Sequence, residues 1–373
     1  MKQYFKTMKT ATKVDYATYA GVVLAFVIVM LCQSMGLLSR SITGMLVPIC
    51  CYICMSLSLN LTVGVLGELS LGHAGFMSVG AFTGIITSMC LSASVSSELV
   101  RIVLSLVVGT IFAAVVGLVV GIPVLRLRGD YLAIVTLAFG EIIKDIINCL
   151  LVGWDERGLH IALNFDGTKS IDSLGLSENG IEIIKGAQGA SGNDRIATFV
   201  VGFVLVMITL IVVLNLVRSR TGRAVMAIRD NRIAAESVGI NVTKYKLIAF
   251  VTSAALAGAA GALFGLNYSS VSAIQFDFNT SILVLVYVVL GGLGNMWGSI
   301  IATVVLYVLP EALREVADLR MLTYAVVLIL VMLATHDPTL RGFFDRLRGK
   351  AVRGLDTASI RRGGKTEKGG DAR

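Results

Sequence analysis

The chain has 373 residues, of which 55% are hydrophobic and only 15% charged, and its formal net charge is +8 at pH 7. Soluble domains carry about 25% charged residues, so this composition excludes an ordinary soluble protein and indicates a membrane protein. The sequence has no G-x-x-x-x-G-K-[ST] phosphate loop, and its three histidines form no HExxH-like pair. We therefore expect no enzyme activity, no ATP hydrolysis by this chain, no cofactor and no metal.

Nine apolar runs follow one another along the chain, and most are long enough for a helix to cross about 30 Å of hydrocarbon. The runs cover residues 16–38, 42–60, 73–92, 102–124, 131–152, 196–217, 247–266, 281–309 and 321–335. Unpaired backbone groups are costly in lipid, and no alternating strand pattern is present. The sequence therefore predicts an all-α, polytopic membrane helix bundle.

Clusters of Lys and Arg near the spans predict which loops face the cytoplasm. Basic residues gather in the arm 1–15, in the segment 218–246 and in the tail 336–373, which we expect to be largely disordered. The loop 153–195 carries seven acidic and four basic residues, so we place it outside. Residues 16–335 then form the transmembrane domain, with both termini in the cytoplasm.

The run 281–309 is 29 residues long and is interrupted by Gly291, Gly292 and Gly294. This pattern indicates two short helices joined by a break rather than one long helix. Counting the run twice gives about ten crossings, including broken or half-length helices. An even number is also what two cytoplasmic termini require.

A second interruption lies early in the chain, over residues 66–75, and with Val65 included both interruptions contain Val-Leu-Gly-x-Leu. Interrupted hydrophobic segments in corresponding halves are typical of transporters, where unwound backbone faces the substrate route. The alternative is that these glycines only allow helices to pack closely. The candidate residues of a translocation path are Glu68, Ser70, His73, Glu141, Gly291, Gly292 and Gly294.

Three charged residues, Glu141, Lys144 and Asp145, are spaced so that they share one face of the run 131–152. A charge facing lipid at the bilayer centre costs about 3 kcal/mol, so these side chains should face protein, water or an interface. They either belong to a polar route or form an internal ion-pair cluster that fixes helix packing.

The basic segment 218–246 has the signals of a short helix. Asp230 is expected to cap it, residues 231–238 to form it, and Gly239 to end it in the left-handed conformation. Ala234 and Ala235 give this helix a small-residue face that another protein can approach. The alternative is a basic loop that only obeys the positive-inside rule.

Several ordered sequence blocks lie between residues 42 and 344. They include Gly67-Glu68-Leu69-Ser70-Leu71-Gly72-His73, Arg128-Gly129-Asp130-Tyr131, Gly222-Arg223-Ala224, Ala234-Ala235-Glu236-Ser237-Val238-Gly239 and Val289-Leu290-Gly291-Gly292-Leu293-Gly294. Together these blocks resemble the membrane permease subunits of branched-chain amino-acid ABC importers, of the LivM type. Glu68 stands where relatives more often have Gln or an apolar residue.

The resemblance implies a permease of the bacterial inner membrane that imports leucine, isoleucine, valine or similar neutral amino acids. The implied partners are a second homologous permease, two cytoplasmic ATPase subunits and an extracytoplasmic substrate-binding protein, in a lipid membrane and without nucleic acid. The block 234–239 resembles the coupling helix of the family. The implied ATPase-coupling residues are Gly222, Arg223, Ala234, Ala235, Glu236 and Gly239.

Two alternatives stay open. The first is a self-sufficient secondary amino-acid transporter driven by an ion gradient, in which Glu141 and Asp145 would couple to protons or sodium. The second is an ABC permease for urea or short amides, since related permeases serve such substrates and selection lies largely in the binding protein.

Overall fold

A computed structural model of the chain describes residues 10–37, 39–92, 94–127, 129–155, 158–164, 180–312 and residue 329. The chain divides into two compact units, residues 1–307 and 308–373, and nearly all described residues belong to the first. The predicted run 321–335 and the tail 336–373 lie outside the described residues, apart from Ile329, as do residues 1–9 of the basic arm.

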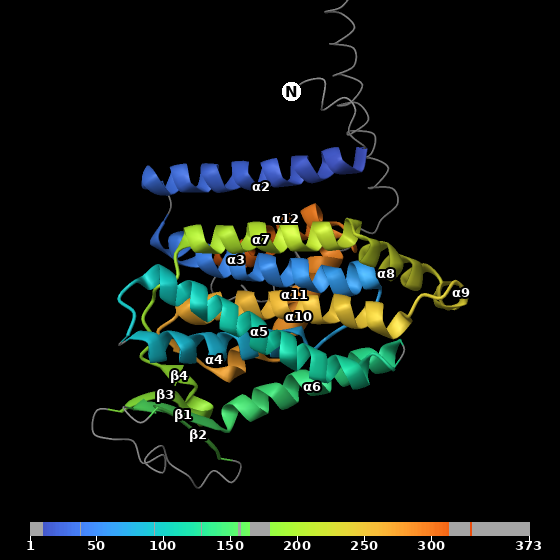
Figure 1. The fold of residues 1–373 in the computed structure, drawn as a ribbon. Helices are drawn as coiled ribbons and strands as arrows, with labels where there is room; N and C mark the ends of the chain where they lie inside the picture. The colour runs from blue at the N-terminus through green and yellow to red at the C-terminus, as the bar shows by residue number, and fades with distance from the viewer. Residues whose placement is uncertain are drawn as a thin grey trace, which may run out of the picture. The chain divides into compact units, whose positions relative to one another are not determined.

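The long helices of the first unit run side by side and follow the predicted apolar runs (Figure 1). In chain order the helices are α2 (Thr10–Ser34), α3 (Arg40–Asn60), α4 (His73–Ser92), α5 (Glu98–Val124), α6 (Asp130–Asn148), α7 (Phe199–Arg218), α8 (Arg220–Asp230), α9 (Arg232–Ser237), α10 (Val242–Asn267), α11 (Phe278–Gly291) and α12 (Met296–Ala312). Within the described residues, α3 with its continuation to Leu66, α4, α5, α7 and α10 are long and apolar enough to cross a membrane. The apolar parts of α2, α11 and α12 are shorter, so about ten crossings stays a prediction.

Helix α10 packs against α3, α4 and α5 and forms the core of the bundle. Its sequence is rich in Ala and Gly, which lets neighbouring backbones approach closely. A Cβ atom on Gly258 would overlap Ala113 of α5, and one on Gly261 would overlap the Met77 carbonyl group of α4. In the most apolar window of α10, 72% of the residues are buried, against 28% in α5. Helix α5 therefore presents most of its apolar surface to the surroundings.

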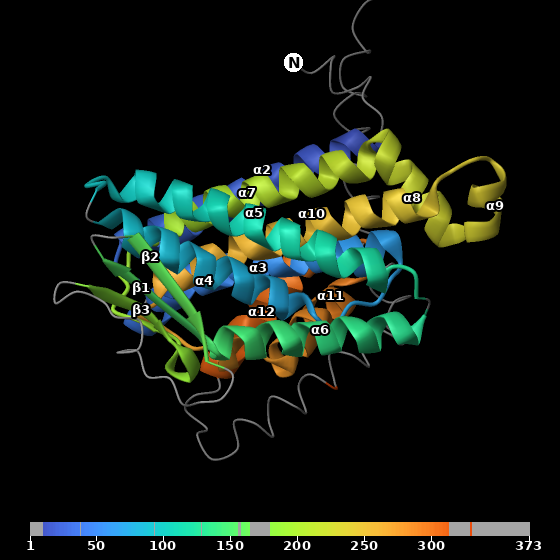
Figure 2. The same cartoon turned by 60° about the horizontal axis from the view of Figure 1, so that its bottom comes forward.

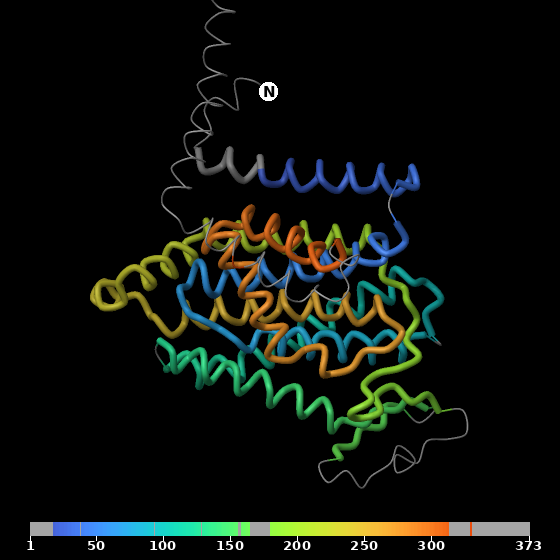
Figure 3. The backbone as a smooth tube through the Cα atoms, turned by 180° about the vertical axis from the view of Figure 1, so that it is seen from behind, coloured from blue at the N-terminus to red at the C-terminus, as the bar shows by residue number. Residues whose placement is uncertain are grey.

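The predicted break in the run 281–309 is confirmed. Helix α11 ends at Gly291 and α12 begins at Met296. Between them, Gly292 and Gly294 have φ angles of +93° and +79°, a left-handed conformation that strains any residue with a Cβ atom. Seen from behind, the orange α11–α12 segment lies on the face of the bundle opposite α5 (Figure 3).

The early interruption is also present, and it has an unusual form. Helix α3 continues as a π-helix over Leu61–Leu66, and Gly67, with φ +80°, ends that turn. Residues 68–72 are irregular, and α4 starts at His73. Single π-helical turns inside or at the end of α-helices are rare and are frequent at functional sites.

A small β-sheet corrects the all-α prediction. Its strands are β1 (Leu150–Asp155), β2 (Gly158–Leu163), β3 (Ile181–Lys185), β4 (Ala190–Ser191) and β5 (Ser270–Val271). They lie in the order β2-β1-β3-β4-β5, and each neighbouring pair is antiparallel. Short 3₁₀ turns over Gly186–Gln188 and Ala273–Phe276 complete this region.

The error arose at the end of the run 131–152. Helix α6 stops at Asn148, and the last apolar residues of the run belong to β1, which pairs with β2 in the register Leu151↔Ala162. The preference for helices holds only where lipid surrounds the backbone, so strands can form once the chain has left the bilayer. Strand β2 lies at the edge of the sheet and alternates between half-buried and exposed residues, which is the pattern of a strand with one face covered and the other open.

The sheet and α9 lie at opposite ends of the helix bundle (Figures 1 and 2). We call these the sheet end and the α9 end. The links α2–α3 and α4–α5 also lie at the sheet end, whereas the link α5–α6 lies at the α9 end. The chain thus passes back and forth between the two ends, as expected for a multi-pass membrane protein.

Candidate functional site

The two chain breaks lie against each other in the fold, although they are more than 200 residues apart in the sequence. Asn60, the last residue of α3, accepts a hydrogen bond from the Gly294 amide at 2.8 Å through Oδ1. The same side chain donates through Nδ2 to Ser299 Oγ of α12 at 2.9 Å. A Cβ atom on Gly64 would overlap both Asn60 Oδ1 and the Gly294 amide. The sequence predicted both breaks, and the structure adds that one side chain joins them.

A row of buried hydroxyl groups extends from the first break into the neighbouring helices. Thr62 Oγ1 donates to Ser253 Oγ of α10 at 2.8 Å, and Ser253 donates in turn to the Ser58 carbonyl group. The Ala74 amide at the start of α4 donates to Ser281 Oγ of α11 at 3.1 Å. Because these groups are satisfied by one another, the interior of the bundle is polar but uncharged here.

His73, a predicted path residue, is the first residue of α4 and is 2% exposed. Its Nε2 atom lies 2.8 Å from Ser58 Oγ. The Ser58 hydroxyl already donates to the Met55 carbonyl group, so it accepts from His73, which assigns the proton to Nε2. The neutral ring is therefore a hydrogen-bond donor that fixes α4 against α3.

Ser70, also a predicted path residue, is 1% exposed, and its hydroxyl has no hydrogen-bond partner among the described residues. The next residue, Leu71, donates its amide to Thr136 Oγ1 of α6 at 3.1 Å. Gly72 lies so close to Thr136 that a Cβ atom would overlap the Thr136 carbonyl group. The irregular segment 68–72 is thus held tightly against α6, with one polar group left unpaired.

Glu68 forms an ion pair with Lys246 in the first turn of α10, and the two side chains are 15% and 6% exposed. This pair was not predicted, because the sequence placed Lys246 only among the basic residues of the 218–246 loop. The available signal was a single acidic residue in the first break and a lysine at the edge of an apolar run. Since both charges are largely removed from water, each depends on the other.

Glu141 of α6 accepts a hydrogen bond from Lys144, and it also accepts the Phe278 amide at the start of α11 at 3.2 Å. It lines a small crevice together with Gly75 and Ser281. Asp145 is exposed and does not line this crevice, although its charge acts on Lys144. Of the two interpretations of the charged cluster, the structure favours the ion pair that fixes helix packing, formed by two of the three residues.

Asp277 lies at the mouth of the same crevice and caps α11. Burial opposes its ionisation, but hydrogen bonds from the Thr280 amide and from the Asn279 and Thr280 side chains outweigh that effect, so the carboxyl pKa lies below its usual value. Its charge adds to the acidic character of this crevice, which Lys144 partly balances.

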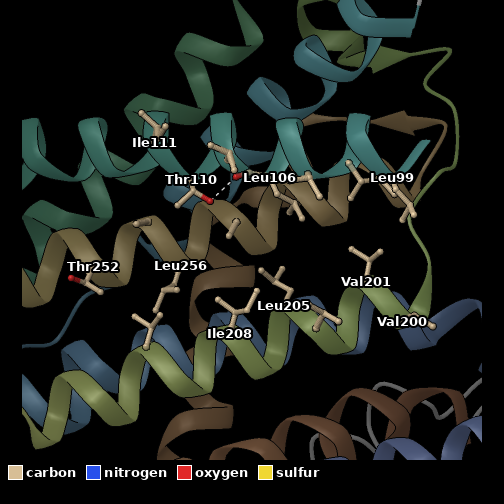
Figure 4. Close-up of a pocket in the computed structure, with 17 residues that line it drawn as sticks. Leu99, Leu106, Thr110, Ile111, Val200, Val201, Leu205, Ile208, Thr252 and Leu256 are labelled. Carbon is tan, nitrogen blue, oxygen red and sulfur yellow. Dashed lines mark hydrogen bonds between the residues drawn. The ribbon is translucent and has the colours of Figure 1, made fainter. Parts of the chain in front are cut away.

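An apolar groove lies away from the breaks, between α5 and α7, with α10 as its floor (Figure 4). Its volume is about 690 Å³. Its two hydroxyl side chains, Thr110 and Thr252, donate to the carbonyl groups of their own helices at 2.6 and 2.7 Å. The groove therefore offers an occupant hydrocarbon contacts and no free hydrogen-bond donor, which makes it unsuited to the carboxylate of a zwitterionic amino acid.

Helix α8 leads from α7 to the predicted coupling helix. Its first turn is closed by Ser219 Oγ, which accepts the Gly222 amide at 3.1 Å. A Cβ atom on Gly222 would overlap the Leu216 and Val217 carbonyl groups, so this glycine allows the sharp turn from α7 into α8. Arg223 donates to the Arg218 carbonyl group at 3.0 Å. The Gly222-Arg223 block thus shapes the end of α7.

Helix α9 is the short helix predicted after residue 230, with one correction to its cap. Asn231, not Asp230, is the N-terminal cap, and its Oδ1 accepts the Ala234 amide at 3.0 Å. Asp230 is instead the last residue of α8. Gly239 has φ +83°, as predicted for the left-handed end, and Glu236 pairs with Arg232 at 2.9 Å.

The predicted small-residue face of α9 is wrong in one residue. Ala235 is 4% exposed and packs against Ile228 and Val242, while Ala234 points outward. The outward side also carries Ile233 and Val238, which are 79% and 75% exposed. Large apolar side chains in a short helix with polar neighbours were the signal that the sequence analysis missed.

Comparison with known proteins places the chain in a family. Residues 41–335 match the family described as "Branched-chain amino acid transport system / permease component". The chain is 35% identical over 299 residues to the high-affinity branched-chain amino acid transport system permease protein LivM of Salmonella typhimurium (strain LT2), and 34% identical over 289 residues to LivM of Escherichia coli (strain K12). Each of these two alignments covers 76% of this chain and 66% of the relative.

A shorter match, 28% identical over 116 residues, joins the chain to the probable ABC transporter permease protein YphD of Escherichia coli (strain K12), over 29% of this chain and 35% of that protein. The chain spans 66% of the length of the LivM relatives it matches. No solved structure matches the chain. The extent of the family match and the identity to the LivM proteins show that this chain belongs to the branched-chain amino acid transport system permease family.

Proposed function

We propose that this chain is the membrane-spanning permease subunit of an ATP-driven importer for leucine, isoleucine, valine or similar neutral amino acids. The family supports this function, and the LivM relatives are named as permease proteins of a high-affinity branched-chain amino acid transport system. The observation in the structure that carries it best is α9, a capped helix that exposes Ile233 and Val238 to the surroundings. An apolar surface of this kind on a basic segment is typical of a docking site for another protein.

The α9 end is proposed to face the cytoplasm. The segment 218–246, which contains α8 and α9, carries the excess of Arg and Lys that marks cytoplasmic loops. The sheet end, with the acidic loop 153–195, would then face outward and receive the substrate-binding protein. With both termini inside, this orientation places the arm 1–15 and the tail 336–373 in the cytoplasm of a bacterial cell.

The partners are proposed to be a second homologous permease, two ATPase subunits and an extracytoplasmic substrate-binding protein. Ile233 and Val238 would enter a cleft of one ATPase subunit, while Ala234 allows close approach and Glu236 lies at the rim of the contact. Gly222 and Arg223 set the direction of α8, and Gly239 ends α9, so these residues position the contact. An aliphatic anchor in a partner pocket is a common centre of such interfaces.

Transport would proceed by alternating access at the two chain breaks. ATP binding can shift the permease between two states only by the difference in affinity of the ATPases for those states. The path candidates Glu68, Ser70, His73, Gly291, Gly292 and Gly294 lie at or beside these breaks. Glu141 accepts hydrogen bonds from Lys144 and from the Phe278 amide of α11, so it holds two helices together. This structural role weakens the alternative of proton coupling through Glu141.

The first test is co-expression with a homologous permease and candidate ATPases, followed by purification through a tag on this chain. We expect the ATPase subunits to co-purify with the wild-type chain and to be lost from Ile233→Asp. The matched control is Ile161→Asp, which changes a side chain of the same type, 61% exposed, at the sheet end. Retention of the ATPases by Ile233→Asp would contradict the docking site.

The second test is uptake in proteoliposomes. ATP-dependent uptake of leucine that survives collapse of ion gradients is the expected result. Uptake by the purified chain alone, driven by a proton or sodium gradient, would establish the secondary transporter instead. Competition by isoleucine and valine, and not by urea, separates the amino-acid importer from an amide permease.

A further inference from the structure

Arg229, in the last turn of α8, reaches from the proposed coupling segment to the first chain break. Its Nη1 atom donates to the Gly64 carbonyl group at 3.1 Å. Gly64 lies in the π-helical turn that ends α3, and the last carbonyl groups of a helix have no partner within the helix. Arg229 therefore supplies from α8 a hydrogen bond that α3 lacks.

Two neighbours hold the Arg229 side chain in this position. Asp230 Oδ1 accepts from Nε and Nη2 at 3.2 and 3.0 Å, which orients the guanidinium plane and leaves Nη1 for Gly64. The aliphatic stem lies on Gly67, where a Cβ atom would come within 2.6 Å of Arg229 Cγ. Gly67 is thus required both for its left-handed conformation and for contact with Arg229.

The contact continues from the first break to the second. The space between Asn60 and the Gly294 amide at position 64 is too small for any residue larger than glycine. Asn60 in turn holds Gly294 and Ser299 by hydrogen bonds. A displacement of the Gly64 carbonyl group therefore acts through these contacts on the position of the α11–α12 break. This chain of contacts consists of packed backbone and directed hydrogen bonds, which is the kind of network that carries coupling between sites.

A second contact comes from the other side of α9. Helix α10 begins just after α9, and its Lys246 pairs with Glu68, one residue beyond Gly67. The two helices that flank α9 thus each hold the same short stretch of chain. A movement of α9 that shifts α8 relative to α10 acts on residues 64–68 from both sides.

We propose that Arg229 is the positioning residue through which α8 and α9 set the arrangement of both chain breaks during transport. This inference rests on the proposed function and adds a residue outside the path and docking residues named above. Arg229 suits the task because its planar, always charged fork can bind Asp230 and Gly64 at the same time, which a lysine cannot do. Loss of this contact should separate ATP hydrolysis from uptake.

The test compares Arg229→Met with Arg220→Met, which removes an exposed arginine from the same helix. In proteoliposomes that contain the full complex, we expect Arg229→Met to retain ATP hydrolysis within about twofold and to lose uptake by about tenfold, the usual size of an allosteric coupling. Arg220→Met should keep the wild-type ratio of uptake to ATP hydrolysed. Arg229→Lys keeps the charge but not the planar guanidinium group. Its ratio of uptake to ATP hydrolysed should lie between the ratios of wild type and Arg229→Met.

An unchanged ratio in Arg229→Met would overturn the inference, and so would a parallel loss of hydrolysis and uptake, which indicates a merely structural role. If Arg229→Met does not fold, as judged by gel filtration, Asp230→Ala decides the question, because it removes the oxygen that accepts from Nε and Nη2 and so releases the guanidinium group without removing it. A wild-type ratio in a folded Asp230→Ala complex would then count against the proposal.

Hydrogen exchange of the purified full chain tests the same contact without transport. We expect amides of residues 61–68 and 292–299 to exchange faster in Arg229→Met by about tenfold, and to be unchanged in Arg220→Met. Absence of this difference overturns the inference even in an active transporter. Absence of ATP-dependent uptake by the wild-type complex, in contrast, refutes the proposed function. The hydrogen-exchange result then decides alone whether Arg229 positions the two chain breaks.

Discussion

The two chain breaks share the sequence Val-Leu-Gly-x-Leu, yet they lie in different surroundings. The first, over residues 61–72, is mostly buried and is held by Arg229, Lys246 and Thr136 from three other helices. The second, over residues 292–295, is open, and Leu293 is 57% exposed. Glycine allows a break in both places, but the neighbouring residues determine whether the backbone conformation of the break is fixed or can change. Substitutions should therefore have large effects at the first break and small ones at the second.

The largest effect is expected from Lys246→Met. This change leaves the Glu68 carboxylate, only 15% exposed, without its partner, and an unpaired buried charge costs about 3 kcal/mol or more. The free energy of unfolding, measured by SDS titration in mixed micelles, should fall by that amount. The double variant Glu68→Leu with Lys246→Met should recover most of the loss, because no charge is left unpaired. Equal stability of the single and double variants would contradict the buried ion pair.

A smaller but clear loss is expected from Gly64→Ala. The added methyl group would overlap Asn60 Oδ1 and the Gly294 amide, and forced overlap in a packed interior costs about 2 kcal/mol. Gly44→Ala is the matched control, because Gly44 lies earlier in the same continuous helical span, within α3, and has open space around its Cα atom. Alanine favours a helix over glycine, so the control should be neutral or slightly stabilising. A similar loss in both variants would show that the close approach of the breaks is not required.

The smallest effect is expected from Gly294→Ala at the second break. The nearest atom to an added Cβ is the Gly64 carbonyl oxygen at 3.6 Å, so space is available, and only the left-handed conformation costs about 1 kcal/mol. Gly294→Asn should cost less, since asparagine adopts this conformation more readily. Thermal unfolding of both variants in detergent gives the comparison. A loss from Gly294→Ala that exceeds the loss from Gly64→Ala would reverse the ranking of the two breaks.

The sequence predicted what the bilayer and local backbone chemistry determine. Long apolar runs became helices, the glycines at 291, 292 and 294 became a break, and Gly239 became a left-handed helix end. Each of these outcomes depends on a residue and its immediate neighbours, or on the requirement that backbone in lipid be hydrogen-bonded within its own segment.

The features that the sequence did not reveal depend on distant partners or lie outside the long apolar helices. Glu68 and Lys246 are 178 positions apart, and nothing local indicates that they pair. Asp230 and Asn231 are both good capping residues, and only the direction of the backbone selected Asn231. Ala235 turns inward because Ile228 and Val242 lie on that side. The sheet is formed by segments outside the long apolar helices.

The pairing of β4 with β5 has a mechanical consequence. It joins the connection between α6 and α7 to the connection between α10 and α11, through the register Ala190↔Val271 and an Asn193 side chain that donates to the Gly265 carbonyl group. These two connections are therefore linked at the sheet end, while the glycine breaks interrupt the helices elsewhere. If the helices move relative to one another during transport, we expect the linked connections to be the point about which they move. The distance between labels at residues 191 and 270 should then stay constant through the transport cycle while the α9 end moves.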